Sequence, residues 1–440
     1  MIVPDNFTDQ NHMDSSTVRA KHKEFLFPCV ANYYEEPIVL TQGLGCCVMD
    51  ADGREYLDFF GGILTLGVGH CHPDVVSRIQ DQAGRLEHTS TLYPTEEIVR
   101  VAERLASMTP GKLKKSFFTT SGTEADETAI ILAKIYTGSQ EIIALRHSYA
   151  GRSHMAISIT GHAPWRPLPT QVAGIKHARS PYCYRCPFDL KYPDCGLRCA
   201  TDIEELIRTE TTGKPAAFIA EPIQGVGGFI TPPKEYFEVA VGIVRKYGGV
   251  FICDEVQTGF GRTGDHWCGI QHWGVEPDIM TFAKSIANGF PVGATIATDE
   301  VANSFTGLSL STFGGNPISM AATEATLDVM EREDVRKRSA ERGRQLRGHL
   351  DAFKEKYPFI GDVRGMGLMQ GIELVEDRTT KEPAPKKTAK LLEAAKKHRL
   401  LIGKGGLYGN VIRIAPSMLV SRSEIDDGAR RLDMALSEVN

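Results

Sequence analysis

Two charged residues of this chain stand at the ends of apolar runs, where side chains of their type can do chemistry. Lys284 follows the run Ile279–Phe282 and comes shortly before the break Gly289–Pro291, and Asp254 follows the run Val250–Cys253, 30 positions earlier. We expect both side chains at the ends of buried elements. A buried lysine amine can form a Schiff base with an aldehyde, and a carboxylate can keep a pyridine nitrogen protonated. Together the two residues predict a site for pyridoxal 5'-phosphate (PLP).

A phosphate group needs hydrogen-bond donors, and the segment Thr119–Ala125 can supply them. Its sequence, Thr-Thr-Ser-Gly-Thr-Glu-Ala, places a strand end, the flexible Gly122 and a helix start in succession. Backbone N–H groups, the positive end of the helix dipole and the hydroxyls of Ser121 and Thr123 would then surround an anion. The same pattern is also typical of an ordinary helix cap. The phosphate interpretation gains weight from the lysine and the aspartate.

The segment that follows Asp254 favours a functional loop over a helix cap. Residues 255–264 are glycine-rich and polar, although they come directly after a core strand. Ligands of open α/β sheets bind in the crevice outside the carboxyl ends of the strands. We therefore expect the Asp254 carboxylate to emerge in such a crevice.

The elements that must position these residues alternate along the chain. Short apolar runs and helical patterns, among them the helices 96–106 and 124–135, follow one another to about residue 310. This order predicts an α/β fold with a mostly parallel sheet covered on both faces. The expected strands are 115–119, 141–145, 216–220, 249–253, 279–282 and 294–298.

The two ends of the chain follow other patterns. The first 60 or so residues are expected to be peripheral and to end in a hairpin over residues 45–58. Beyond residue 310 the chain predicts a second, α+β domain. Its expected elements are the helices 318–332 and 335–356, a strand-rich segment 361–374, a helix 386–399, a strand 411–415 and a closing helix 423–437.

Composition excludes some classes of function. The 440 residues carry a net charge of −5, so no basic surface for nucleic acid is expected. The N-terminus holds acids and amides instead of a basic and apolar targeting segment, and no stretch approaches the roughly 20 apolar residues of a membrane span. We therefore expect a cytoplasmic enzyme that binds neither nucleic acid nor membranes.

Four of the ten cysteines lie close together as Cys183-x2-Cys186-x8-Cys195-x3-Cys199. The spacing leaves three interpretations open: a zinc site, reduced cysteines in a compact loop, or a disulfide. The other six are expected to be small core residues instead of nucleophiles. They are Cys29, Cys46, Cys47, Cys71, Cys253 and Cys268.

Three motifs resemble the signature of class III (ω-type) aminotransferases: Asp254–Gly264, Thr281–Lys284 and Gly289–Ala294. The resemblance runs from Pro37 to the C-terminus. It implies PLP as cofactor and the type I fold of PLP-dependent transferases. In that fold a large domain holds a mostly parallel seven-stranded sheet covered by helices, and a smaller α+β domain is built from both ends of the chain. The corresponding ranges are 61–320 for the large domain, 321–440 for the small one and 1–60 for the N-terminal segment that joins it.

The resemblance also implies a role for each matching residue. Lys284, Asp254 and Glu221 would be the catalytic residues, as Schiff-base lysine, pyridinium partner and neighbour of the ring oxygen. Arg413 would hold a substrate carboxylate. The other cofactor contacts would be Ser121, Gly122 and Thr123 at the phosphate, Val256 under the ring, Tyr149 on its other face, Gln257 beside the ring oxygen and Thr312 at the phosphate of the neighbouring subunit. The last contact implies a homodimer, or a dimer of dimers, with active sites at the subunit interface.

Two positions depart from the family's pattern: Ala150 stands where histidine is frequent, and Asp126 where asparagine is frequent. The segment Cys183–Cys199 resembles an insertion found near the alanine–glyoxylate and pyruvate aminotransferases, so pyruvate or glyoxylate is the expected acceptor. The implied reaction transfers an amino group in two half-reactions with ping-pong kinetics.

Other functions of the same fold stay open, namely those of amino-mutases, decarboxylating transaminases and phospho-lyases. Outside enzymes, the alternative is a regulator that only binds PLP.

Overall fold

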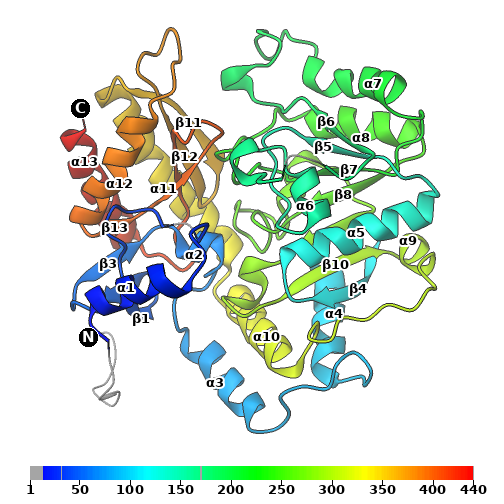
Figure 1. Cartoon of the computed structure of the whole chain (residues 1–440), viewed down its shortest axis with the longest axis horizontal. Helices are drawn as coiled ribbons and strands as arrows, with labels where there is room; N and C mark the ends of the chain where they lie inside the picture. The colour runs from blue at the N-terminus through cyan, green and yellow to red at the C-terminus, as the bar shows by residue number, and fades with distance from the viewer. Residues whose placement is uncertain (1–12, 31, 169–170, 440) are drawn as a thin grey trace.

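The computed structural model describes residues 13–30, 32–168 and 171–439. Residues 1–12, on which the expected absence of a targeting segment depended, lie outside the described residues. Figure 1 shows a seven-stranded sheet in one part of the molecule and two four-stranded sheets in the other. No helix of the described residues is long and apolar enough to cross a membrane.

The seven-stranded sheet has the strand order β4-β10-β9-β8-β7-β5-β6. Only β10 runs antiparallel to its neighbours, which confirms the expected mostly parallel α/β fold. The strands are β4 (Leu113–Thr119), β5 (Ile142–Leu145), β6 (Ile175–Ala178), β7 (Ala217–Ala220), β8 (Val250–Asp254), β9 (Ile279–Phe282) and β10 (Gly293–Thr298). The sequence did not predict β6, an edge strand whose central Lys176 and His177 interrupt the apolar pattern.

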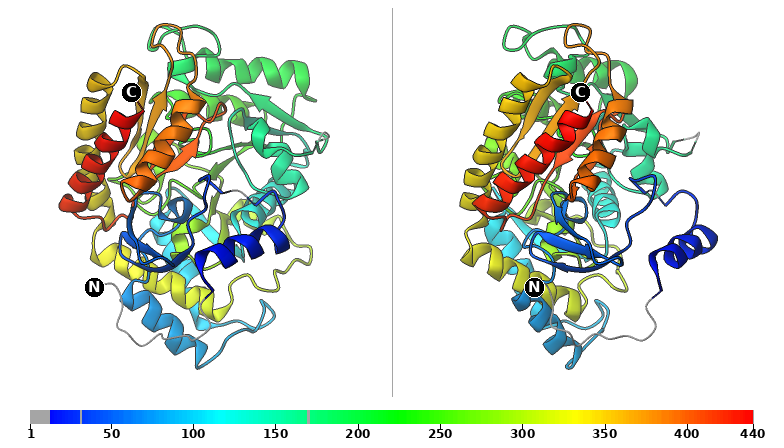
Figure 2. Two further views of the ribbon diagram at one scale, coloured as in Figure 1. Left: turned by 60° about the vertical axis from the view of Figure 1, so that its left-hand side comes forward. Right: turned by 90° about the vertical axis from the view of Figure 1, so that its left-hand side faces the viewer.

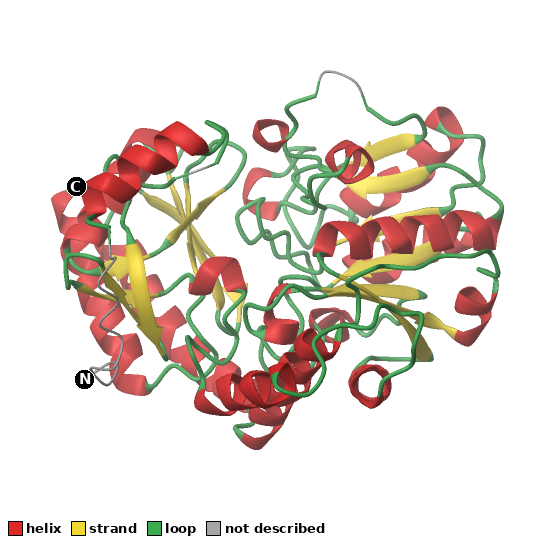
Figure 3. Cartoon of the chain, turned by 60° about the horizontal axis from the view of Figure 1, so that its bottom comes forward, coloured by secondary structure: helices red, strands yellow, loops and turns green. Residues whose placement is uncertain are grey.

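Side chains of the central strands alternate between two apolar clusters, as the two-residue period of a strand requires. In β8, Phe251 packs with helix α8 (Tyr236–Lys246) on one face, and Ile252 packs with helix α5 (Gly122–Thr137) on the other. Figure 3 shows helices on both faces of the sheet. Burial on both sides explains why these strands read as continuous apolar runs.

The C-terminal part of the chain forms a four-stranded antiparallel sheet of order β11-β12-β15-β14, called here the C-terminal sheet. Helices α11, α12 and α13 lie beside one another near it (Figure 2). The elements are α10 (Pro317–Arg332), α11 (Val335–Lys356), β11 (Ile360–Met366), β12 (Met369–Leu374), α12 (Pro385–Lys397), β14 (Gly403–Gly405), β15 (Val411–Ile414) and α13 (Arg422–Glu438). Each helix and strand expected after residue 310 is present, with ends that differ by one or two residues.

The third sheet joins the two ends of the chain. Strands β1 (Leu40–Leu44), β2 (Cys47–Asp50) and β3 (Glu55–Asp58) form the expected antiparallel hairpin and one further strand, and β13 (Leu400–Leu401) adds in parallel to β3. Helix α1 (Ser15–Phe25), which the sequence did not predict, is mostly exposed and is joined to the hairpin by a hydrogen bond from Ser15 Oγ to Asp52 Oδ1 at 2.8 Å. The remaining helices are α2 (Gly61–Leu64), α3 (Pro73–Ala83), α4 (Glu96–Met108), α6 (His154–Ile159), α7 (Arg198–Glu210) and α9 (Asp299–Asn303). The division into domains at residues 60 and 320 stays a prediction.

Candidate active site

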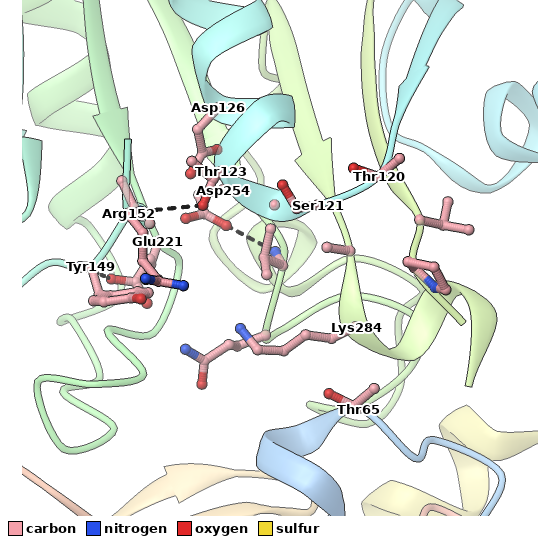
Figure 4. A pocket seen from close by; sticks show the side chains of 18 of the residues that line it. Thr65, Thr120, Ser121, Thr123, Asp126, Tyr149, Arg152, Glu221, Asp254 and Lys284 are labelled. Carbon is pink, nitrogen blue, oxygen red and sulfur yellow. Dashed lines mark hydrogen bonds between the residues drawn. The ribbon is translucent and has the colours of Figure 1, made fainter. Parts of the chain in front are cut away.

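A cavity of about 290 Å³ opens where the carboxyl ends of β7, β8 and β9 meet. Glu221 directly follows β7, Asp254 is the last residue of β8, and Lys284 follows β9 after one alanine. Parallel strands bring their carboxyl ends to one edge, so residues far apart in the chain converge there. The lining consists of Thr65, Thr120, Ser121, Gly122, Thr123, Asp126, Tyr149, Ala150, Gly151, Arg152, Glu221, Asp254, Val256, Gln257, Ala283, Lys284, Phe290, Pro291 and Val292 (Figure 4).

Lys284 lies on a strained piece of backbone at the start of a short 3-10 helix. Its φ is 52°, in the left-handed region that side chains other than glycine seldom occupy. Burial lowers the pKa of its amine, and the carboxylates of Asp254 and Glu221 oppose that shift. Backbone strain of this kind persists where the surrounding structure enforces it, which is common at functional sites. Here it accompanies an amine that burial shifts toward the neutral, nucleophilic form.

Asp254 and Glu221 are both buried, 6% and 5% exposed, and both are hydrogen-bonded to backbone amides. Val256 N–H donates to Asp254 Oδ1 at 2.9 Å. Tyr149 N–H donates to Glu221 Oε1 at 3.1 Å, and Gly225 N–H to Oε2 at 2.8 Å. Burial raises the pKa of Asp254 to about 6 and, together with the charge of Asp254, that of Glu221 to about 8. Each carboxyl group therefore lies in a place that would favour a nearby positive charge.

Asp126 is a third buried carboxyl group of this cavity, and it was not among the predicted site residues. It lies one turn into α5 and accepts a hydrogen bond from Thr281 Oγ1 at 2.7 Å. Thr281 is the register partner of Asp254 across β8 and β9. Burial, followed by the charge of Asp254, raises the pKa of Asp126 well above its usual value. The sequence did contain a signal for this position. Asp126 comes four residues after Gly122, and residues four apart lie on the same face of a helix, so Asp126 could have been expected to face the cofactor site.

The expected phosphate site lies at the N-terminus of α5. The Ser121 hydroxyl accepts from Glu124 N–H at 3.3 Å, as a helix cap does, and Arg152 N–H donates to Thr123 Oγ1 at 3.3 Å. A Cβ on Gly151 would lie 2.2 Å from Thr123 Oγ1, so glycine is required there for the two segments to meet. The cap and anion-binding interpretations of the sequence therefore describe one and the same helix end.

The walls of the cavity carry two further predicted residues. The ring of Tyr149 meets that of Trp165 edge-on, with centroids 5.8 Å apart. Among the described residues, the buried Gln257 Oε1 has no hydrogen-bond partner. A Cβ on Gly225 would lie 2.3 Å from the Gln257 amide group, so the loop after Glu221 presses closely on this side chain. An unpartnered buried acceptor facing a cavity indicates a missing donor.

These residues fit PLP. The end of α5 offers N–H groups and hydroxyls for a phosphate, Lys284 offers an amine for an aldehyde, and Asp254 offers a buried carboxylate for a protonated ring nitrogen. The unpartnered Gln257 Oε1 lies in the same lining.

Two predicted residues lie outside the lining. Thr312 is exposed, in the loop before α10. Arg413 is 4% exposed on β15. Its guanidinium group donates to Lys404 O at 3.1 Å and Gly225 O at 3.4 Å, and lies 4.8 Å from the centroid of the Phe60 ring. Through Gly225 it is linked to the loop that also supports Glu221.

The cysteine cluster does not form a metal site in the described residues, where no group of three or more His, Cys, Asp or Glu side chains is placed to hold an ion. Cys183, Cys186, Cys195 and Cys199 are free thiols around a very small cavity of about 20 Å³. Of the other six, Cys46, Cys253 and Cys268 are buried, whereas Cys29 and Cys71 are exposed, contrary to the expectation of core positions.

Comparison with known sequences gives close relatives over nearly the whole chain. The mitochondrial alanine–glyoxylate aminotransferase 2 homolog 2 of Arabidopsis thaliana is 43% identical over 97% of this chain and 88% of its own. The mitochondrial human alanine–glyoxylate aminotransferase 2 is 38% identical over 95% and 85%. A leucine/methionine racemase of Thermococcus litoralis is 36% identical over 94% of both chains. The mitochondrial names contradict the cytoplasmic location expected from the sequence, so that expectation is wrong.

Solved structures agree with the sequence relatives. An (S)-enantioselective ω-transaminase from Thermomicrobium roseum matches with a TM-score of 0.90 and 33% identity, over 98% of this chain and all of that one (100%). An amine transaminase from an uncultivated Pseudomonas species, in a PLP-bound form, matches with a TM-score of 0.89 and 30% identity, over 95% and 99%. The family model of class III aminotransferases matches residues 29–436. With a cavity whose side chains fit PLP and a family match over residues 29–436, the chain belongs to the class III aminotransferases and uses PLP.

Proposed function

We propose that this aminotransferase passes an amino group from an amine or amino acid to pyruvate or glyoxylate, in two half-reactions at the cavity described above. The observation that carries the proposal is the buried amine of Lys284, which shares one cavity with the buried carboxyl groups of Asp254 and Glu221. The acceptor is inferred from the alanine–glyoxylate aminotransferases among the relatives.

The side chains divide the work of the reaction. Bound PLP supplies an aldehyde for the amine and a ring that takes up negative charge. Lys284, whose amine burial shifts toward the neutral form, would hold the aldehyde until the substrate amine takes its place at that carbon. The freed Lys284 amine would then accept a proton from the amine-bearing carbon of the substrate and return one. Asp254 would hold the proton on the ring nitrogen, and Glu221 and Gln257 would flank the ring oxygen. Ser121, Gly122 and Thr123 would hold the phosphate.

Arg413 is the proposed partner of the substrate carboxylate. Within the described residues its guanidinium group donates to two backbone carbonyls and also has the Tyr33 hydroxyl as a neighbour, and no carboxylate lies at ion-pair distance. A buried guanidinium group without a counter-ion is costly, and an arriving carboxylate would compensate it with two parallel hydrogen bonds.

Removing Arg413 tests this role. Arg413→Ala should weaken keto acid binding by about 2–4 kcal/mol, the range for a lost charge-assisted contact plus a stranded carboxylate. Single-turnover titrations with pyruvate, with glyoxylate and with a primary amine lacking a carboxylate would measure it. Equal losses for the amine and the keto acids would contradict carboxylate recognition.

A homodimer with active sites at the subunit interface is proposed as the assembly. The loop that carries Thr312 exposes large apolar side chains: Leu308, Leu310 and Phe313 are 107%, 56% and 61% exposed. Leu92 and Tyr93, in the loop before α4, are 69% and 67% exposed. Apolar groups exposed on this scale usually mark an interaction surface. Sedimentation equilibrium would measure the mass, and a monomer at micromolar concentration would contradict the proposal.

Half-reaction spectra test the reaction itself. An amine donor should bleach the visible absorbance of the lysine-bound cofactor, and pyruvate or glyoxylate should restore it; a protein that only binds PLP would not complete this cycle. A panel of α-, β- and ω-amines against both keto acids would identify the donor.

Racemisation is the second candidate, because one relative is named a leucine/methionine racemase. In D₂O a racemase would return its amino acid with inverted configuration and deuterium at Cα, without any keto acid. Amine-dependent conversion of the keto acid to an amino acid would instead support the aminotransferase.

A further inference from the structure

The segment between β6 and α7 is attached to the C-terminal sheet through a buried carboxylate, Glu373. This residue lies on β12, and its side chain is 0% exposed. Tyr182 and Arg185 reach it from the segment that also holds the cysteine cluster, almost two hundred residues earlier in the chain. In Figure 1, β12 lies in the left-hand part of the molecule and β6 in the right-hand part. We call Tyr182 and Arg185 the clasp.

Glu373 has more partners than any carboxyl group of the active-site cavity. Its oxygens accept from the Tyr182 hydroxyl, from Arg185 Nε at 2.5 Å, from Arg364 Nη1 at 2.7 Å and from Asn410 Nδ2 at 3.3 Å. The Tyr182 hydroxyl also accepts from Arg364 Nη2 at 3.1 Å, and the guanidinium carbon of Arg364 lies 4.9 Å from the Tyr182 ring centroid. Arg364 Nη1 also donates to Asp362 Oδ2 at 2.9 Å. The clasp and Arg364 therefore form one largely buried network around the Glu373 carboxylate.

Two connections lead from this network to the active site. Arg364 Nε donates to Gly228 O at 2.8 Å, and Gly228 N–H donates to Gly225 O at 3.1 Å. The same Gly225 oxygen accepts from Arg413, and the Gly225 N–H supports Glu221. The second connection is Asn410, which directly precedes β15, the strand of Arg413. Asn410 Nδ2 donates to Leu374 O at 2.8 Å as well as to Glu373.

Close packing fixes these connections. Gly228 has a φ of +98°, and a Cβ there would lie 2.9 Å from Val411 and 3.1 Å from Arg364. A Cβ on Gly361 would lie 2.2 Å from the Tyr184 hydroxyl, so the clasp segment also presses against β11. Interiors packed this tightly transmit a displacement instead of absorbing it.

We infer that Tyr182 and Arg185 are positioning residues, which hold the loop Gly225–Gly228 and the strand of Arg413 in register so that the guanidinium group meets a substrate carboxylate. This inference rests on the proposed role of Arg413. It also gives the cysteine-containing segment a mechanical task that needs no metal: it carries the clasp from the seven-stranded sheet to the C-terminal sheet.

The test uses the full-length holoenzyme with the double variant Tyr182→Phe/Arg185→Gln. Tyr192→Phe is the matched control, because its hydroxyl belongs to the same segment and contacts the exposed Glu235. Kinetics are measured with pyruvate, with glyoxylate and with an amine lacking a carboxylate. Hydrogen–deuterium exchange is followed in peptides 221–230 and 403–414, with 116–135 as internal reference.

In the double variant we expect the KM for keto acids to rise between about twofold and thirtyfold, the range for couplings carried through such networks. The kcat of the amine half-reaction should stay close to that of Tyr192→Phe. Amide exchange should become faster in both test peptides and remain unchanged in the reference. A residue that only stabilises the fold would lower the melting temperature without this split.

Two results would overturn the inference. Unchanged exchange in peptides 221–230 and 403–414 would show that the clasp does not hold them. Faster exchange with an unchanged KM for keto acids would show that the loop Gly225–Gly228 does not position Arg413 for the substrate carboxylate. Single variants Tyr182→Phe and Arg185→Lys, which keep the ring and the charge, supply the same readouts if the double variant does not fold. Failure of the proposed function is separate, because Arg413→Ala would then affect amine and keto acid equally.

Discussion

The protein buries carboxyl groups in two regions, and their pKa values are shifted in opposite directions. Around Glu373, burial would raise the pKa, but the charges of Arg364 and Arg185 and the Tyr182 hydroxyl hold it below the usual value. At the cavity, burial raises the pKa of Glu221 to about 8 and that of Asp254 to about 6, because backbone amides and one lysine compensate them only in part. Glu373 has its compensating positive charges and hydrogen-bond donors within the protein itself. The carboxyl groups of the cavity favour a further cation besides Lys284, which is the property of a cofactor site.

The buried carboxyl groups of the two regions respond to pH in opposite directions. Glu373, with its lowered pKa, stabilises the fold at neutral pH, and this contribution is lost as the pH falls through its folded value. Glu221, with its raised pKa, binds more protons in the folded than in the unfolded state between its usual value of 4.5 and about 8. Stability from this group therefore decreases as the pH rises through that window. The same kind of residue thus acts in opposite directions in the two regions.

The largest effect is expected at Lys284. Lys284→Ala should leave a folded protein that still binds PLP, because the end of α5 and Asp254 remain, but turnover should fall by several orders of magnitude. Steady-state rates and the visible spectrum of the bound cofactor would measure this. Transamination close to that of the parent would contradict the assignment of the cavity.

Asp254→Asn should come next. A neutral amide cannot hold the ring proton through a charge pair, so much of the cofactor should remain bound while catalysis is lost. Asp254→Glu should be less damaging because it keeps the charge. Cofactor content by absorbance and kcat would be compared for both variants. If both turn over like the parent, the pyridine partner lies elsewhere.

Glu373→Gln should be strongly destabilising, by about 3–5 kcal/mol, since the buried Arg364 and the half-buried Arg185 lose a shared counter-charge and Arg364 keeps only Asp362. Urea unfolding would give the change in free energy. Glu235→Gln serves as a control: Glu235 is exposed and pairs with a tyrosine hydroxyl, so a change within about 0.5 kcal/mol is expected. A loss equally small for Glu373→Gln would remove the distinction between the two regions.

The smallest effect is expected at Glu221, and its sign is the informative part. In the cofactor-free protein, Glu221→Gln should have little effect at pH 5, where the parent carboxyl group is already neutral in the fold. At pH 8 the variant should be the more stable protein, by about 1–4 °C in melting temperature, since it lacks a group that is costly to ionise. Melting temperatures of parent and variant from pH 5 to pH 8 would measure the difference. A variant that becomes relatively less stable with rising pH would show that Glu221 is ionised and paired.

Local sequence determined the chemistry that this chain can do. Lys284 and Asp254 each end an apolar run, and such a run buried on both faces of a sheet delivers its last residue to the carboxyl edge. The phosphate site at Ser121–Thr123 could be predicted from the sequence in the same way. A helix that starts directly after a strand places its free N–H groups and hydroxyls at one known position. Lys284 and Asp254 already predicted the pyridoxal cofactor, and the class III motifs added the family. These features depend on residues that are neighbours along the chain, so they can be predicted before the tertiary structure is known.

Which distant residues meet depends on how whole helices and strands pack. Asp126 joins the cavity because Thr281, a residue of another element, contacts it. The pairing of β13 with β3 brings residues 400–401 to residues 57–58, and Tyr182 meets Glu373 across the two parts of the molecule. Edge strand β6 and helix α1 were not predicted, since β6 carries polar residues in its centre and α1 is mostly exposed. Contacts of this kind depend on how whole elements pack, and a residue's own neighbours in sequence carry almost no information about them.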